Sequence, residues 1–435
     1  MYAILLLVFV PKGVFVLGII ALVFLTLFLL SGIFGPTPRY EIADRKGLPA
    51  NESGEFLALV EALVDAKANR KGRLEVLTNG DCFYEAELAA IARARRSVNL
   101  EAYIFKKSAI GDRYLDALTK KAREGLRVNL VLDAFGSAGA TRKFFRPLIE
   151  AGGKVNWYNS VAWHRLTHMD NRTHRELLIV DGQIGFIGGA GVADQWYKGA
   201  NGRPRWRDTM VRVEGDAVPS LQATFAENCL GASGELIAGD AYFPHIICPD
   251  ETVAMVINST PTVGGSTRAR ILFQLLLASA QKTISITTPY FLPDKSLTRE
   301  LCRAIEERGV RVRILVPGRK SDHMFTRSTS RGGYGPLLKA GAEVYEYQPA
   351  MIHAKVLCVD GLWSVVGSTN FDNRSFGIND EVNLAVSDIA FAERLEQDMT
   401  ADLKESRRIS LEQWTHRPIT ERAPELLGWI FERQQ

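Results

Sequence analysis

The chain has 435 residues, 46% of them hydrophobic and 23% charged, a composition that excludes intrinsic disorder and collagen-like repeats. The 53 Lys and Arg residues exceed the 49 Asp and Glu residues by only four, which disfavours a polybasic nucleic-acid-binding protein. The five cysteines form no CxxC pair, so we expect neither a zinc ribbon nor a disulfide framework.

The first element in chain order is an uncharged segment between Lys12 and Arg39. Its core, Gly13–Phe34, has 22 residues, enough to span the roughly 30 Å hydrocarbon layer as a helix. The segment is apolar all round, unlike a core helix, and longer than the apolar region of a signal peptide. Residues 1–38 are therefore predicted to be a membrane anchor. This predicts a cell (inner or plasma) membrane location with a single N-terminal span, and the flanking basic residues favour a cytoplasmic body.

Residues 39–75 are predicted to contain a polar linker and a first helix, Gly54–Ala68. Beyond them the sequence repeats itself. HRELLIVDGQIGFIGG begins at His174, and the similar HAKVLCVDGLWSVVGS begins at His353. The offset between these histidines nearly equals the offset between two strand-end phenylalanines, Phe105 and Phe291. Such a near-constant offset indicates an internal duplication, with a first half at residues 76–245 and a second half at residues 246–400.

Predicted strands alternate with predicted helices in both halves. We therefore expect an α/β fold of two duplicated units, each a mixed, mostly parallel sheet with helices on both faces. Residues 401–435 carry Trp414, Trp429 and other apolar residues among Arg and Glu. They are predicted to form an amphipathic tail, which either lies in the membrane interface or packs on the domain.

The second half carries a polar constellation around His353. His353 and Lys355 are two residues apart in a predicted strand, so their side chains project to the same side. Asp360 follows at the turn, and the returning strand brings Ser368 and Asn370 to the same end. An imidazole, an ammonium, a hydroxyl and a carboxamide together suit a phosphate group. The alternative is a purely structural role, a buried histidine beside a salt bridge. The second occurrence of the motif argues against this alternative.

The HxK-x4-D pattern, its trailing Gly-Ser-x-Asn and its tandem occurrence resemble the phospholipase D superfamily. LTNGDCFYEAELAAIARARRSVNLEAYIF and LLKAGAEVYEYQPAMIHAKVLCVDG resemble more specifically the bacterial cardiolipin synthases, and the resemblance runs from about Leu77 to about Met399. It implies that both motifs form one active site. One histidine attacks phosphorus to give a phosphohistidine, the other protonates the leaving alcohol, and an acceptor alcohol then displaces the enzyme histidine.

The same resemblance implies a set of site residues. His174 would be the nucleophile and His353 the general acid and base, although the near-symmetry of the two halves leaves these two roles open. The other implied catalytic residues are Lys355, Asp181 and Asp360, and the implied phosphate-binding residues are Lys355, Ser368 and Asn370. No metal is implied. No cofactor is expected either, because phosphodiester exchange is close to thermoneutral and the sequence has no P-loop or strand-GxGxxG-helix pattern.

The first half departs from this pattern, because Glu176 stands where the family has lysine and two glycines replace the serine and asparagine. A carboxylate facing a phosphate would repel it. Three interpretations remain open: Glu176 turns away and another cation serves, Glu176 holds a residue such as Lys355, or the first half-site is impaired. The candidate replacement cations are Arg172, Arg205 and Arg207. Because His174 and Asp181 are present, we expect an active enzyme.

An acidic residue follows each motif and is placed to orient a histidine. Glu381 follows His353 in the second half, and Asp208 follows His174 in the first half across a longer intervening segment. A surface salt bridge is the alternative for either carboxylate.

These features predict a membrane-anchored phosphatidyltransferase of the cardiolipin synthase type. Its expected partners are phospholipid substrates, phosphatidylglycerol or a similar anionic phospholipid, and the bilayer itself. One alternative is a phospholipase D hydrolase that uses water as acceptor. Another is a phosphodiesterase or nuclease of the same superfamily, which the small net charge and the anchor disfavour, so no nucleic acid is expected as a partner. The last is a catalytically impaired membrane scaffold, suggested by Glu176.

Overall fold

The computed structural model describes residues 16, 18–24, 26, 39–159, 171–261, 267–322 and 324–418. The predicted anchor, Gly13–Phe34, lies largely outside these residues, and so does the predicted tail from residue 419 onward. Within the described part of the chain, no helix is both long enough and apolar enough to cross a membrane.

Two sets of strands build the body. Those of the first half are β1 (Asn69–Thr78), β2 (Ser97–Ala102), β3 (Arg127–Asp133), β4 (Lys154–Tyr158), β5 (Leu177–Val180), β6 (Ile184–Gly188) and β7 (Thr209–Gly215). Those of the second half are β8 (Glu251–Ser259), β9 (Thr283–Thr287), β11 (Arg311–Pro317), β12 (Glu343–Tyr347), β13 (Val356–Val359), β14 (Trp363–Gly367), β16 (Glu381–Ser387) and β17 (Ser406–Ile409). A separate two-stranded sheet pairs β10 (Phe291–Leu292) with β15 (Phe371–Asp372).

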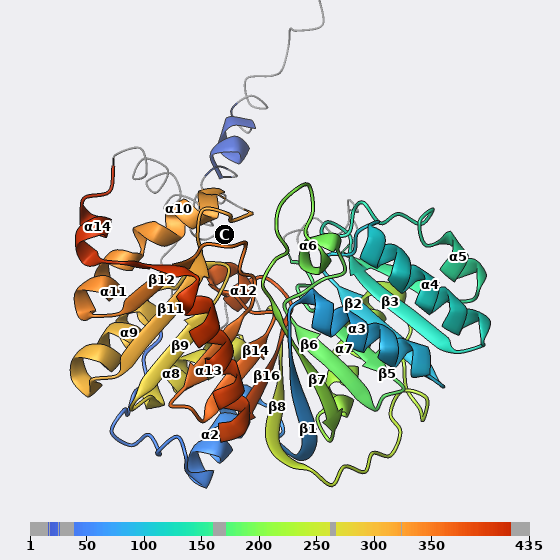
Figure 1. Ribbon diagram of the computed structural model, residues 1–435, viewed down its shortest axis with the longest axis horizontal. Coiled ribbons are helices and arrows are strands. Elements are labelled where there is room, and N and C mark those ends of the chain that lie inside the picture. The colour runs from blue at the N-terminus through green and yellow to red at the C-terminus, as the bar shows by residue number, and fades with distance from the viewer. Residues whose placement is uncertain are drawn as a thin grey trace, which may run out of the picture.

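One fifteen-stranded sheet runs through both halves in the order β17-β12-β11-β9-β13-β14-β16-β8-β1-β7-β6-β5-β2-β3-β4 (Figure 1). The run from β12 to β8 repeats the run from β4 to β1 with equivalent strands in equivalent places, which is the duplication seen in the sequence. The halves meet where β1 pairs with β8.

The prediction of a mostly parallel sheet is wrong. Among the described strands of this sheet, parallel pairing is confined to β2–β3–β4 and β9–β11–β12, and the other neighbours are antiparallel. The reason is local: tight Asp-Gly turns connect β5 to β6 and β13 to β14, and a connection that short joins only antiparallel strands. Both aspartates take positive φ values, 55° at Asp181 and 56° at Asp360, which Asp tolerates better than most residues.

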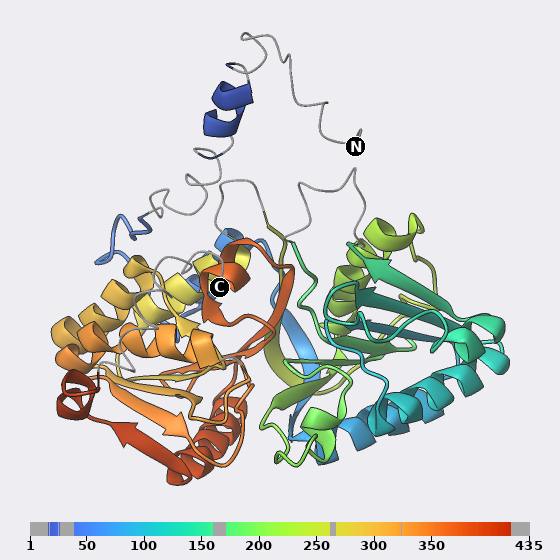
Figure 2. The ribbon, with the colours of Figure 1, turned by 90° about the horizontal axis from the view of Figure 1, so that it is seen from above.

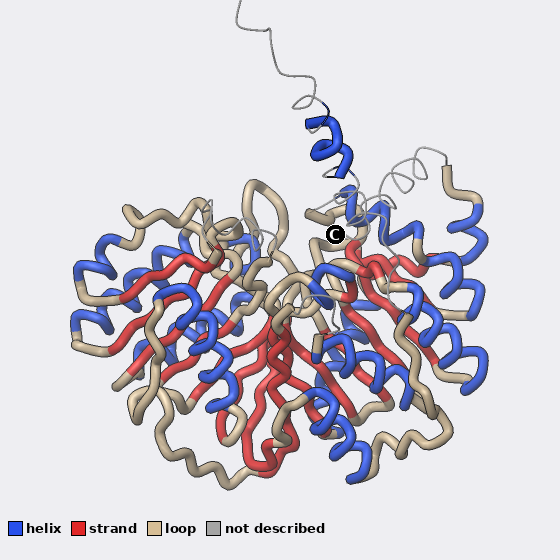
Figure 3. The backbone as a smooth tube through the Cα atoms, turned by 180° about the vertical axis from the view of Figure 1, so that it is seen from behind, coloured by secondary structure: helices blue, strands red, loops and turns tan. Residues whose placement is uncertain are grey.

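Helices cover the sheet on both sides (Figures 1 and 3). Their bounds are α2 (Gly54–Val64), α3 (Gly80–Arg93), α4 (Ala109–Arg123), α5 (Arg146–Glu150), α6 (Asp194–Tyr197), α7 (Val218–Ser233), α8 (Arg268–Ser279), α9 (Lys295–Arg308), α10 (Met324–Gly332), α11 (Tyr334–Ala340), α12 (Asn373–Gly377), α13 (Ile389–Lys404) and α14 (Leu411–Thr415). The predicted first helix is α2, which ends at Val64 and packs its Phe56 against Trp363 of the second half, 5.8 Å between ring centroids.

The body has three large apolar cores, of which the third fixes the halves relative to each other. One lies in the first half around α3 and α4, one in the second half around α8 and α9, and the third combines strands of both halves with α7 and α13. Strand β14 also contacts β6 and β7 across the boundary between the halves, and β16 contacts β6. The halves thus lie side by side (Figure 2), and the loops at the upper end of the sheet in Figure 1 are brought together between α6 and α12.

Candidate active site

Short backbone bridges between the halves position both motif histidines. His174 and His353 lie just before the short strands β5 and β13. The backbone N–H of His174 donates to the carbonyl of Asp380, 2.9 Å away, and that of His353 donates to the carbonyl of Arg207, 2.7 Å away. Each histidine is therefore held by a segment of the opposite half.

Both histidines line one cleft of about 530 Å³. The structure thus brings the two motif copies to a single site, as the duplication predicts. Lining residues from the first half are Tyr103, Ile104, Phe135, Arg172, His174, Glu176, Gly189, Trp196 and Trp206. Those from the second half are Tyr290, Asp322, Thr326, His353, Asn370, Asp372, Arg374, Ser375 and Asn379.

Glu381 orients the imidazole of His174. Nδ1 of His174 lies 3.1 Å from each carboxylate oxygen of Glu381, which is fully buried. The hydroxyl of Ser368 donates to the same carboxylate, and the ring of Tyr103 packs edge-on against the imidazole. Donation of Nδ1–H to Glu381 leaves the lone pair on Nε2.

Asp208 orients the imidazole of His353. Oδ2 of Asp208 lies 2.9 Å from Nδ1 of His353 and accepts the indole N–H of Trp196, also at 2.9 Å. Trp196 and Trp206 each lie 5.3 Å from the imidazole, centroid to centroid. Burial lowers the pKa of His353 and the charge of Lys355 adds to this, while the bond to Asp208 opposes it.

Lys355 is the buried cation of the second motif. Its Nζ donates to the carbonyl of His353 at 2.9 Å and lies 2.8 Å from Nδ1 and 3.1 Å from Nε2 of the same residue. Burial lowers the pKa of Lys355, whereas the carboxylates of Asp208, Glu381 and Glu176 raise it.

The interpretation that each carboxylate orients the histidine of its own half is corrected by these contacts. Glu381 of the second half bonds His174 of the first, and Asp208 of the first half bonds His353 of the second. The cause is the pair of parallel bridges Thr173–Asp380 and Arg207–Ile352, which set each histidine beside the acid of the other half.

The two residues predicted to bind phosphate along with Lys355 occupy different positions. Ser368 is fully buried, with its hydroxyl donating to Glu381 and accepting the N–H of Val382 at 3.0 Å. Ser368 therefore supports the carboxylate of Glu381 and is not among the residues that line the cleft. Its contact with phosphate stays a prediction. Asn370 lines the cleft, and its buried Oδ1 has no hydrogen-bond partner among the described residues.

Comparison with known proteins agrees with this geometry. The model of the family described as cardiolipin synthase, phospholipase D-like domain, matches residues 88–201 and 274–403. Cardiolipin synthase 1 of Bacillus anthracis is 36% identical over 386 residues, covering 86% of this chain and 75% of that protein. The major cardiolipin synthase ClsA of Bacillus subtilis strain 168 is 35% identical over 362 residues, covering 82% and 74%. The chain belongs to the cardiolipin synthase family.

Membership of this family makes the chain a phosphatidyltransferase of the phospholipase D type. The phosphatidylserine synthase of Haemophilus influenzae Rd KW20 shares the fold, with a TM-score of 0.65 at 14% identity over 86% of this chain and 99% of that one.

The motif aspartates Asp181 and Asp360, which are predicted to be catalytic, are not among the residues that line the cleft. They stand at the far ends of β5 and β13 from the histidines. Asp181 accepts the backbone N–H groups of residues 95–97, and Asp360 accepts those of residues 281–283 and the Asn51 amide. Each aspartate therefore fastens a hairpin turn to the start of the neighbouring strand.

Replacing Asp360 with alanine is expected to lower the free energy of unfolding by about 2 kcal/mol, because several backbone donors lose a charged acceptor and the positive φ becomes strained. The rate of transfer should stay within about three-fold of wild type, because no contact to the cleft is lost. Urea unfolding and a transfer assay check both, with Asp116→Ala on the exposed face of α4 as control. A lower transfer rate with an unchanged free energy of unfolding would show that Asp360 takes part in catalysis.

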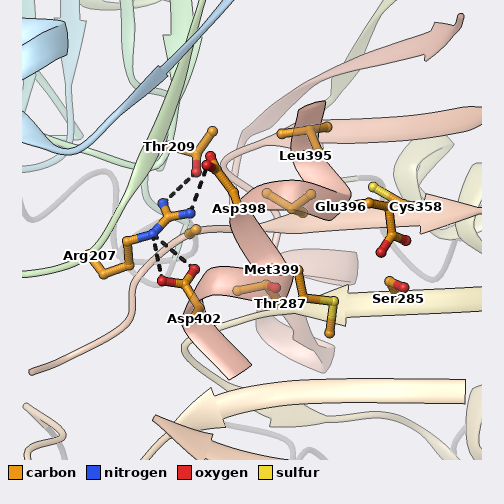
Figure 4. A pocket seen from close by; sticks show the side chains of 12 residues that line it. Arg207, Thr209, Ser285, Thr287, Cys358, Leu395, Glu396, Asp398, Met399 and Asp402 are labelled. Carbon is orange, nitrogen blue, oxygen red and sulfur yellow. Dashed lines mark hydrogen bonds and ion pairs between the residues drawn. The ribbon is translucent and has the colours of Figure 1, made fainter. Parts of the chain in front are cut away.

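The three arginines considered as replacements for the missing lysine lie in different surroundings. Arg205 pairs with Asp81 at the surface, 2.8 Å apart. Arg207 is buried and bonds Asp402 and Thr209, with Asp398 3.4 Å away (Figure 4). Since those carboxylates lie on α13, Arg207 ties the halves together. Of the three, Arg172 lines the cleft.

Several residues that line the cleft are not among those predicted from the sequence. Trp196 and Trp206 flank His353, while Arg374 lines the cleft from the second half with Asp372, whose pKa burial raises to about 6. Trp206 stands two residues before Asp208 in RWRD, a local signal that could have pointed to it. Nothing in the local sequence distinguishes Trp196 or Arg374 from ordinary core and surface residues.

Proposed function

We propose that this phosphatidyltransferase joins two phosphatidylglycerol molecules into cardiolipin and glycerol through a phosphohistidine on His174. The observation that carries the proposal is the pair of histidines on one cleft, each oriented by a buried carboxylate from the opposite half. Paired, oriented imidazoles suit a displacement that is split into two in-line steps.

In the first step, Nε2 of His174 attacks phosphorus and the P–O bond to glycerol breaks. His353 enters this step as the imidazolium ion, with Nδ1–H held by Asp208, and gives its Nε2 proton to the departing glycerol oxygen. In the second step, His353 takes the proton of the acceptor hydroxyl, whose oxygen attacks phosphorus and displaces His174. Each step transfers one proton and exchanges one bond at phosphorus, so no cofactor enters.

The assignment of His174 as nucleophile rests on what surrounds each Nε2. The ammonium of Lys355 lies 3.1 Å from Nε2 of His353. Among the described residues, none makes a hydrogen bond to Nε2 of His174, whose side chain is 14% exposed. His174 therefore presents an open lone pair to the cleft. Mass spectrometry of the rapidly quenched enzyme would locate the phosphatidyl group, and finding that group on His353 would reverse the two roles.

Two kinds of group are proposed to hold the substrates. Lys355 and Asn370 would bind the non-bridging oxygens of the reacting phosphodiester. Arg172, which lies over the ring of Phe135, and Arg374 would bind the phosphate of the acceptor lipid, because both line the cleft. An anionic acceptor such as phosphatidylglycerol fits this second pair of cations.

Replacing Arg172 with glutamine should raise KM for the anionic acceptor by about ten-fold and change kcat little, because one charge-assisted contact to the acceptor is lost. Initial rates against phosphatidylglycerol concentration in mixed micelles check this. Arg205→Gln, which alters an exposed ion pair, is the control. An equal loss in kcat with KM unchanged would place Arg172 at the reacting phosphate instead.

We also propose that residues 1–38 anchor the enzyme in the cell membrane. The support is the uncharged stretch of 22 residues from Gly13 to Phe34. The full chain should remain in the membrane pellet after alkaline carbonate extraction, and release into the supernatant would contradict an integral anchor.

The reaction is tested by incubating the full-length enzyme with phosphatidylglycerol vesicles and separating the lipids by thin-layer chromatography. Cardiolipin with an equal amount of glycerol supports the proposal. Phosphatidic acid as the main product would show a hydrolase. Absence of any product would favour the impaired scaffold.

A further inference from the structure

Glu176 occupies the lysine position of the first motif, and its side chain is held in the wall of the cleft. The residue is 5% exposed and lines the cleft together with His174. Its Oε1 accepts the backbone N–H of Tyr103 at 3.2 Å, with that of Ile104 at 3.5 Å. These donors follow the end of β2, so Glu176 has a built acceptor position and does not turn away from the site.

The two glycines of the first motif accommodate this arrangement. A Cβ at Gly191 would lie 3.0 Å from Oε1 of Glu176, and a Cβ at Gly189 would lie 2.9 Å from Cδ of Lys355. At Gly191 the added Cβ would also lie 2.5 Å from the backbone carbonyl oxygen of Ile104, so the backbone excludes an asparagine there together with Glu176. A serine at Gly189 would crowd Lys355. Glu176 and the two glycines are therefore sterically compatible with one another and with Lys355.

The surroundings of Glu176 favour its neutral form. Burial raises the pKa of Glu176 well above its ordinary value; the N–H of Ile104 and the charge of Lys355 oppose this, and Asp208 adds to it. A phosphodiester anion in the cleft would add a further negative charge and raise this pKa again. The titratable groups that interact electrostatically with Glu176 include Lys355, Asp208, Tyr84 and Tyr103. The other titratable or charged residues that line the cleft are His174, His353, Asp322, Asp372, Tyr290, Arg172 and Arg374.

We propose that Glu176 binds the substrate phosphodiester as a neutral carboxylic acid, with Oε1 accepting the backbone N–H groups and protonated Oε2 donating a hydrogen bond to a non-bridging oxygen. This rests on the proposed function, since it places a phosphodiester in this cleft. The proton stays on Oε2 throughout, so Glu176 is a binding group and transfers nothing. Lys355 then supplies the cation and Glu176 the neutral donor where the family pattern has two ammonium groups.

The glutamine variant separates this role from a charged one. In Glu176→Gln the amide oxygen accepts the same backbone N–H groups and the amide nitrogen donates to the phosphate, so kcat/KM should stay within about three-fold of wild type. In Glu176→Ala the donor is lost, and kcat/KM should fall about 10- to 100-fold. In Glu176→Lys the ammonium would face two backbone donors left without an acceptor, so kcat/KM should fall at least as far.

The pH profile gives a second readout. The protonated form is the active one, so the contribution of Glu176 is present at low pH and is lost as the pH rises through its raised pKa. The wild-type profile of kcat/KM should contain this alkaline decline, and the Glu176→Gln profile should lack it. Lys355 and the other titratable groups of the cleft are still present in that variant, so a decline that is missing from its profile belongs to Glu176.

Infrared difference spectroscopy tests the protonation state without any turnover. The wild-type minus Glu176→Gln spectrum at neutral pH, recorded with a short-chain phosphodiester present, should show the carbonyl band of a protonated carboxylic acid. Carboxylate bands alone would overturn the proposal, as would a Glu176→Gln variant as impaired as Glu176→Ala or a faster Glu176→Lys. If the band is present and no cardiolipin forms from phosphatidylglycerol, the proposed function fails while the state of Glu176 stands.

Discussion

Replacing His174 with asparagine is expected to lower the rate of phosphatidyl transfer by about 10⁴-fold or more, because the loss of a nucleophile removes the covalent route altogether. The rate of the His353→Asn variant should be lower than that of wild type by about 10²–10⁴-fold, which is the usual contribution of a general acid and base. The measurement is the single-turnover formation of cardiolipin from labelled phosphatidylglycerol. Both side chains border an open cleft, so thermal unfolding should be close to that of wild type.

The matched control is His245→Asn, since His245 is exposed outside the cleft in the segment between α7 and β8. It should retain the wild-type rate. If His174→Asn kept activity within a few-fold of wild type, the phosphohistidine would be wrong. If His353→Asn kept activity within a few-fold of wild type, His353 would not be the general acid and base.

The exchanged carboxylates predict a second large effect. Glu381→Gln and Asp208→Asn should each lower kcat by about 10³–10⁴-fold, because an amide no longer fixes the productive tautomer or stabilises the imidazolium. NMR of the imidazole resonances shows which carboxylate contacts which histidine. Glu381→Gln should change the chemical shifts of the His174 imidazole and leave those of His353 unchanged, because Glu381 contacts only His174 of the two. Asp208→Asn should lower the pKa of His353 further, since Asp208 is among the groups that raise it.

Trp206→Phe is the control for Asp208→Asn, because it keeps an aromatic ring beside His353 and leaves the Asp208 bond intact. Trp206→Phe should lower kcat much less than Asp208→Asn does. If Glu381→Gln moved the resonances of His353 in place of those of His174, each carboxylate would orient the histidine of its own half. The pairing across the halves would then be wrong.

The sequence by itself determined the duplication, the α/β class and the chemical groups of the site. These depend on local information: the repeated order of strands, the Asp-Gly turns, and the two-residue spacing that puts His353 and Lys355 on one side of a strand. The family followed from the same residues. Glu176 was also visible as a departure, because a single substitution in a repeated motif stands out against the other copy.

Only the tertiary structure decided strand direction, the partners of the histidines and the surroundings of Glu176. Spacing along the chain does not show which half a strand end faces, so Glu381 and Asp208 were paired with the wrong histidines. Ser368 and Asp360 share one motif, but the buried Glu381 holds the serine, and the backbone N–H groups of residues 281–283 hold the aspartate. The protonation of a carboxyl depends on burial and on neighbouring charges, which exist only once the two halves have closed around the cleft.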